Sequence, residues 1–178
     1  MSEFGKVYGG ALYALAQEEH LEDVLLEEMD TICASLKENP DYLRLIDSRS
    51  ISKAERLSML DVAFIGRINV YLLNFMKILC ERNGFSQIHA CREAYVRCYN
   101  EDKGIVPAKA VSATEMSDEQ RRRLVEALEK KTGKRVQLTL DVDPQLRGGL
   151  RVEMEGYRYD NTVASRMDQL RRALQAQS

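Results

Sequence analysis

The sequence of 178 residues predicts an α + (α+β) fold, with an N-terminal six-helix bundle at residues 1–104 and a small α+β domain at residues 105–178. Up to about Lys103, apolar residues recur every three to four positions, which is the helical period. Beyond Gly104 the period becomes two, most clearly at residues 135–142, where apolar and polar residues alternate strictly. The second domain is therefore expected to combine a short sheet with two helices.

Recognisable start and stop signals divide the N-terminal half into helices. Ser52 followed by Glu55 is the signature of a capping box. Pro40 suits the first position of a helix, and Asn83-Gly84 suits a left-handed C-terminal cap. From these signals and the apolar stripes we predict helices at about residues 4–20, 21–37, 40–46, 52–64, 69–83 and 86–103. Short helices joined by short turns are typical of an antiparallel bundle.

Two adjacent glycines, Gly9 and Gly10, interrupt the first predicted helix. A glycine in a helix interior costs about 1 kcal/mol relative to alanine, so the pair needs a packing reason. One reason would be a tight contact within the bundle. The other would be a groove that admits a helix from outside. The residues alone leave both interpretations open.

After Gly104 short strands alternate with helices. Ser117 and Gln120 form a second capping box, which opens a helix that ends near Gly133. Strands are predicted at about residues 105–113, 136–142, 150–154 and 157–159, with a tight hairpin turn between the last two. The residues Asp160-Asn161-Thr162 are expected to cap a final helix that carries Val163, Met167, Leu170 and Leu174.

The composition is that of a globular protein, with 44% apolar and 30% charged residues. We expect a soluble protein, because no apolar run is long enough to cross a membrane and the chain begins without a secretory pattern. The cysteines Cys33, Cys80, Cys91 and Cys98 lie in helical patterns without a Cys-x-x-Cys pair, which predicts free thiols in a reducing compartment. His20 and His89 lack ligand partners at helical spacing, so we expect no zinc site.

The net charge of −2 hides a difference between the two halves. Residues 1–104 carry 12 Lys and Arg against 17 Asp and Glu, which gives −5, whereas residues 105–178 carry 14 against 11, which gives +3. Such asymmetry favours two surfaces with different partners over a nucleic-acid-binding module, which would be clearly basic on one face. The Arg121-Arg122-Arg123 tract is interpreted as a solvated helix face.

Motifs for binding nucleotide phosphates or for a catalytic nucleophile are missing from the sequence. Gly148-Gly149 precedes a predicted strand rather than a helix, so it lacks the geometry for holding a phosphate. Asp141 and Asp143 share a strand face by spacing, but we interpret them as exposed and non-catalytic. We therefore expect no catalytic residues, no metal and no cofactor. The residues by themselves indicate a two-domain binding or scaffold protein.

Four short motifs occur in a fixed order along the chain. They are Tyr8, Ala11, Leu12 and Ala14 (as in Y-A-x-A-L), residues 110–117 (as in V-x-S-A-x-x-L-S), Asp143-Pro144 with Gly148-Gly149 (as in D-P-x-L-x-G-G), and Tyr159-Asp160 with Val163 and Leu170 (as in D-x-S-V…L). Together they resemble the delta subunit of rotary F-type ATP synthases, the oligomycin-sensitivity-conferring protein family. The resemblance covers essentially the whole chain. The chain departs from the family pattern at Gly9-Gly10, Arg147 and Thr162.

The resemblance implies a non-catalytic peripheral-stalk (stator) subunit of a proton-translocating ATP synthase. It implies that residues 1–104 bind the N-terminal helix of an alpha subunit at the catalytic head, and that residues 105–178 bind the C-terminal ends of the b subunits. The protein would then resist the torque of the rotor and would be a monomer when isolated. As a peripheral membrane protein it would reach the cytoplasmic face of the cell membrane only through the complex.

By analogy with the family, the alpha-subunit helix would lie in a groove between the first and fifth helices. The residues that this analogy selects are Tyr8, Ala11, Leu12, Leu15, Leu72, Phe75, Met76 and Leu79. An apolar residue on a bundle helix is more often core than interface, so the division between groove and core stays open. Two other classes also stay open, namely an unrelated helical adaptor and an enzyme whose site would appear as titratable groups clustered in a deep pocket.

Overall fold

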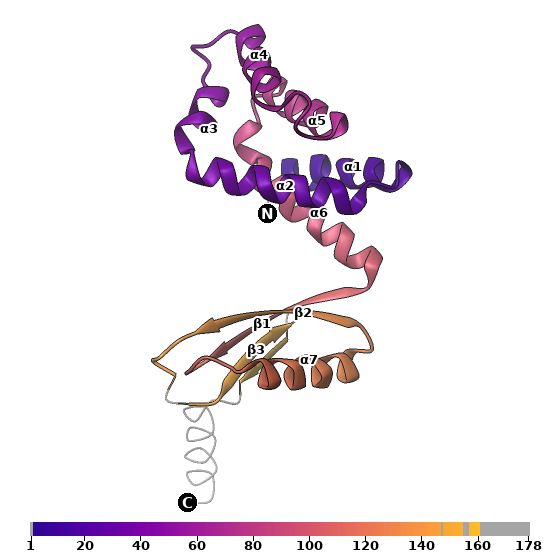
Figure 1. The fold of residues 1–178 in the computed structure, drawn as a ribbon, viewed down its shortest axis with the longest axis vertical. Coiled ribbons are helices and arrows are strands. Elements are labelled where there is room, and N and C mark those ends of the chain that lie inside the picture. Colours follow the sequence, from indigo (N-terminus) through magenta and orange to yellow (C-terminus); the bar gives the residue numbers. More distant parts are fainter. Residues whose placement is uncertain (1, 147, 155–156, 161–178) are drawn as a thin grey trace, which may run out of the picture. The chain divides into compact units, whose positions relative to one another are not determined.

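The computed structural model describes residues 2–146, 148–154 and 157–160. In this part of the chain, seven α-helices, one short 3-10 helix and a four-stranded mixed sheet form an α+β fold (Figure 1). The chain divides into two compact units, one through Tyr99 and one from Asn100 on. The unit boundary thus falls within the last turn of the sixth helix, a few residues before Gly104.

Six α-helices precede the first strand. Their bounds are α1 (Glu3–Glu18), α2 (Glu22–Glu38), α3 (Pro40–Asp47), α4 (Lys53–Phe64), α5 (Val70–Glu81) and α6 (Ile88–Lys103), with the 3-10 helix η1 (Phe85–Gln87) before α6. The predicted ends differ from these by about two residues at most. The capping box of Ser52 and Glu55 is formed in both directions, and the Asn69 side chain accepts a hydrogen bond from the Tyr71 N–H group at 2.9 Å.

The turn after α5 differs in detail from the expected cap. Asn83, with φ of 52°, is the residue in the left-handed region, whereas Gly84 has φ of −122°. Gly84 is needed for another reason, because a Cβ atom there would lie 2.5 Å from Cζ of Phe4. The glycine therefore lets the start of α1 approach the end of α5.

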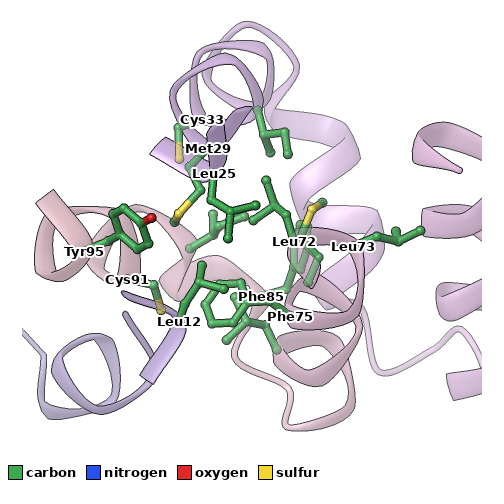
Figure 2. Packing of buried hydrophobic residues seen from close by; sticks show 14 of the residues in the cluster. Leu12, Leu25, Met29, Cys33, Leu72, Leu73, Phe75, Phe85, Cys91 and Tyr95 are labelled. Carbon is green, nitrogen blue, oxygen red and sulfur yellow. The ribbon is translucent and has the colours of Figure 1, made fainter. Parts of the chain in front are cut away.

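The core of the N-terminal unit is formed by side chains from all of its helices (Figure 2). The largest fully buried side chains are Tyr95, Phe85, Leu25, Met29, Ile46, Leu60, Leu72, Met76, Leu79, Ile88 and Cys80. Each buried side chain of the size of Leu or Phe contributes roughly 1.5–3 kcal/mol relative to its exposed state. The hydroxyl of Tyr95 keeps a partner in this apolar setting, since it donates to the carbonyl of Glu22 at 2.9 Å.

Two buried or half-buried polar groups join helix ends across this core. The guanidinium of Arg56, 6% exposed, donates to the carbonyl of Ile46 and to Oδ1 of Asn83, each at 3.2 Å. It thereby connects α4 to the ends of α3 and α5. The carboxylate of Glu28 accepts the Asn69 N–H group at 2.9 and 3.0 Å, which links α2 to the start of α5.

The cysteines Cys33, Cys80 and Cys91 are buried free thiols, and Cys98 is half-buried. Burial raises the pKa of Cys33 and of Cys91 from 9.0 to about 11, since a thiolate would lose its hydration there. Folding therefore favours the protonated thiols.

The difference in thiol pKa between the folded and the unfolded chain predicts a loss of stability at alkaline pH. Below pH 9 both the folded and the unfolded chain hold the thiol protons, so the contribution is fully present. As the pH rises from 9 to 11, the unfolded chain releases those protons first, and the free energy of unfolding should fall by up to about 2 kcal/mol per thiol, because each pKa unit corresponds to about 1.4 kcal/mol. Urea unfolding at several pH values in this window measures the slope. A variant with Cys33→Ala and Cys91→Ala should show a shallower slope, and an unchanged slope would contradict the assignment.

In the C-terminal unit, helix α7 covers one face of the sheet (Figure 1). The elements are β1 (Ile105–Ser112), α7 (Asp118–Thr132), β2 (Arg135–Val142), β3 (Leu150–Met154) and β4 (Tyr157–Asp160). The sheet order is β2-β1-β3-β4, with β1 and β2 parallel and the other pairs antiparallel. Leu128 of α7 packs on the buried side chains of Val106, Ala108, Ala110, Val136, Leu138, Val152 and Met154.

The opposite face of the sheet carries paired charges. Lys109 of β1 forms an ion pair of 2.7 Å with Asp141 of β2, and Arg158 of β4 forms one of 3.4 Å with Glu153 of β3. One apolar and one charged face explain the strict alternation seen in the sequence. The predicted final helix after Asp160 lies outside the described residues, as do the two residues between β3 and β4.

Candidate functional site

Asp141 and Asp143, the two carboxylates weighed for acid–base chemistry, each interact with another residue in the described part of the chain. Asp141 is paired with Lys109, and Oδ1 of Asp143 accepts the backbone N–H group of Gln145 at 3.0 Å. The described residues contain no group of three or more His, Cys, Asp or Glu side chains that could hold a metal ion.

In the folded chain Gly148 and Gly149 lie near the N-terminus of α7, although in the sequence they are followed by a strand. Gly148 and Gly149 border a cavity of about 300 Å³ together with residues 112–116 and Gln120. The N-terminus of α7 is already capped, because Ser117 and Gln120 form a complete capping box. Its first turn also carries Asp118 and Glu119, which disfavour an anion.

Helices α1 and α5 lie antiparallel along one side of the N-terminal unit. The ring of Phe4, at the start of α1, packs on Gly84 beyond the end of α5. At the other end, the hydroxyl of Tyr71 in the first turn of α5 hydrogen-bonds with Glu19, just after α1. This hydrogen bond and the charge of Glu19 raise the pKa of Tyr71. These two contacts pair the start of α1 with the end of α5 and the end of α1 with the start of α5, so the two helices run in opposite directions.

We define the α1–α5 surface as Tyr8, Ala11 and Leu15 on α1 together with Tyr71 and Ile78 on α5. On each helix these residues lie at helical spacing from the contacts just described. Tyr8 and Leu15 are half-buried and Ala11 is exposed, while Ile78 is 45% exposed. The ring of Tyr8 stacks on the ring of Phe4, with the two ring centroids 4.2 Å apart.

Five of the eight residues that the family analogy selected for the groove are buried in the structure. Leu12, Leu72, Phe75, Met76 and Leu79 are core residues, between 0% and 7% exposed. They pack inward against other helices (Figure 2), so they support the surface from below and do not line it. The other three selected residues belong to the α1–α5 surface.

The two glycines of α1 have different environments. A Cβ atom at Gly9 would lie 2.2 Å from the carbonyl oxygen of Cys91 and 2.8 Å from Cβ of Ala94. Gly9 therefore serves a close contact between α1 and α6. At Gly10 nothing lies within 4 Å of an added Cβ atom. The close contact with α6 thus explains why residue 9 is a glycine. Gly10, next to Ala11, faces open space instead.

The sequence analysis missed Tyr71 and Ile78, which lie on the outer face of α5. A signal for them exists, since Lys77 and Glu81 are the only charged residues between Val70 and Glu81. A helix that is apolar on all sides is normally covered on all sides. Here one face of α5 fills the core, and the outer face leaves Val70 60% and Ile78 45% exposed.

The comparisons with known proteins agree with one another. The family model described as "ATP synthase delta (OSCP) subunit" matches residues 5–174. The chain belongs to this family. Among curated relatives, the ATP synthase subunit delta of Lactobacillus johnsonii is 32% identical over 173 residues, covering 97% of this chain and 94% of the relative. That of Clostridioides difficile is 27% identical over 168 residues, with coverage of 94% and 93%.

The same fold occurs in a chain of a solved structure. A chain of the Toxoplasma gondii mitochondrial ATP synthase hexamer superposes with a TM-score of 0.74 at 16% identity, covering 97% of this chain and 98% of that one. In the described residues, the helices are all too short or too polar to span a membrane. As a member of the delta (OSCP) family, the chain is a subunit of an enzyme complex, so its exposed apolar residues are candidates for contacts with other subunits.

Proposed function

We propose that this chain is a non-catalytic peripheral-stalk subunit that links the catalytic head of an F-type ATP synthase to its b subunits. In this proposal the six helices of residues 1–104 act as one bundle and bind the N-terminal helix of an alpha subunit. Residues 105–178 bind the C-terminal ends of the b subunits. The protein catalyses no step itself, resists rotor torque, and reaches the cytoplasmic face of the membrane only through the complex.

The α1–α5 surface is the observation that carries this proposal. Its two helices run in opposite directions, and it presents apolar side chains from both, with Ala11 exposed and Tyr8 and Leu15 half-buried. An amphipathic helix binds such a strip through apolar residues at helical spacing. The 16 residues of α1 extend over about 24 Å at 1.5 Å per residue, which matches roughly four turns of a bound helix.

The experiment that tests the proposal is a titration of the full-length chain with two peptides. One contains the first turns of the alpha subunit from the same organism, and the other contains the C-terminal segment of the b subunit. We expect the alpha peptide to shift the amide resonances of Ala11, Leu15 and Ile78, and the b peptide to shift resonances beyond Asn100. Binding of neither peptide to the full-length chain would refute the proposed role.

Association with the alpha peptide should depend on salt. The N-terminal half carries 12 Lys and Arg against 17 Asp and Glu, and charge complementarity mainly accelerates association. For a peptide of net positive charge, we expect the association rate constant to fall by about threefold to tenfold between 0.02 and 0.5 M salt, because the Debye length shortens. Stopped-flow fluorescence measures this rate. A rate that does not change with salt would mean that apolar contact alone drives binding.

A further inference from the structure

A second hollow lies on the N-terminal unit, away from α1. It is a cavity of about 470 Å³ between α2 and the segment that leads from α4 to α5. Ile32, Phe64 and Ile68 give it an apolar lining, and Glu27 and Arg67 stand on its two sides. We call this hollow the α2–α4 groove. None of the residues that line it belongs to α1.

The segment that forms one wall of the groove also exposes large apolar side chains. Val62 is 82%, Ile65 65% and Val70 60% exposed. Scattered apolar residues are normal on a protein surface, but several on one short segment next to an apolar hollow indicate a contact site. The wall and the hollow together therefore offer an apolar surface to a partner.

The charges on α2 determine which partner fits. Three acidic residues of α2 are engaged within the protein, since Asp23 accepts a hydrogen bond from Tyr99, Asp30 pairs with Arg92, and Glu28 accepts the Asn69 N–H group. Within the described residues, no hydrogen bond or ion pair joins the carboxylate of Glu27 to another residue. On the α2 side, this exposed carboxylate beside an apolar hollow is complementary to a cation that flanks an apolar side chain, whereas Arg67 on the opposite side would favour an anion there.

The backbone pattern of α2 further restricts the partner to a helix. The hydroxyl groups of Thr31 and Ser35, which line the groove, donate to carbonyls of their own helix at 3.0 and 2.9 Å. This wall is helical and has no strand edge that could pair with the backbone of an extended peptide, which favours a helical partner. A helix satisfies its own backbone. From Glu27 to Ser35 the wall extends about 12 Å, or roughly two helical turns.

We propose that the α2–α4 groove is a second docking site, for a short amphipathic helix of a partner protein that presents a Lys or Arg beside its apolar stripe. The apolar side chains enter the hollow over Ile32 and Phe64, and the cation pairs with Glu27. The site goes beyond the proposed function, because it does not depend on the identity of the partner at the α1–α5 surface.

The test uses the full-length chain and two model peptides of 14 residues that share one amphipathic helical pattern. One peptide combines leucine with lysine, and the other combines leucine with glutamate. We expect the lysine peptide to shift the amide resonances of Thr31, Ser35 and Ala63. The Glu27→Lys variant should bind the lysine peptide on the order of tenfold more weakly and the glutamate peptide more tightly, because the change reverses one close charge pair. Glu93→Lys, an exposed acidic position on α6, is the matched control and should change neither affinity by more than about twofold.

Three outcomes would overturn this inference. Resonance shifts confined to Ala11 and Ile78 would assign the peptide to the α1–α5 surface and leave the proposed function intact. Equal effects of Glu27→Lys and Glu93→Lys would mean that only the overall charge of the protein matters. Self-association of the chain that Ala63→Arg abolishes in sedimentation experiments would make a second copy the occupant of the groove.

Discussion

Replacing Ala11 with glutamate is expected to abolish binding of the alpha-subunit N-terminal peptide, with at least a 100-fold increase in Kd. Ala11 is exposed at the centre of the α1–α5 surface, where an apolar helix would cover it. A carboxylate in that position would be desolvated without a partner, at a cost of several kcal/mol. A loss of about 2.8 kcal/mol already corresponds to 100-fold. Isothermal titration calorimetry measures the change.

The control for this experiment separates binding from folding. Ala54, in the first turn of α4, is also exposed, and Ala54→Glu should leave both Kd and stability nearly unchanged. Because Ala11 is exposed, we expect Ala11→Glu to change the free energy of unfolding by less than about 1 kcal/mol, as for most surface substitutions. An unchanged Kd in a folded Ala11→Glu protein would exclude this surface as the binding site.

The sequence predicts the helices and strands well wherever their ends depend on local chemistry. Ser52 with Glu55 and Ser117 with Gln120 are capping boxes in the structure, because each one satisfies its own backbone N–H groups within a single turn. Strict alternation likewise identifies β2. It cannot reveal that β2 pairs in parallel with β1 at the edge of the sheet, since strand order depends on contacts between distant segments.

The exposed face of α5 was harder to predict for a related reason. Helix α5 is apolar on both faces, and a helical period alone does not tell which face meets the core. The analogy with the family selected Leu72, Met76 and Leu79, which are fully buried, whereas Ile78 on the outer face is exposed. The contact between Tyr71 and Glu19, which identifies the outer face, joins residues far apart in the sequence and is visible only in the folded chain.

The two neighbouring glycines of α1 should respond to the same substitution in opposite directions. Gly9→Ala would bring a Cβ atom to 2.2 Å from the carbonyl oxygen of Cys91, and a backbone atom in the middle of α6 cannot move aside as a flexible side chain could. We expect α1 to be displaced from α6 and the free energy of unfolding to fall by about 2–3 kcal/mol, as for other overpacked cores.

Gly10→Ala meets no atom within 4 Å, so only the helix propensity changes, and we expect a gain of up to about 1 kcal/mol. Urea unfolding of both variants under identical conditions measures the two effects, with the wild-type chain as reference. Stabilisation by both substitutions would mean that α1 does not pack closely on α6. Destabilisation by both would mean that α1 is not helical around residue 10. Opposite signs follow only if one glycine faces α6 and its neighbour faces open space.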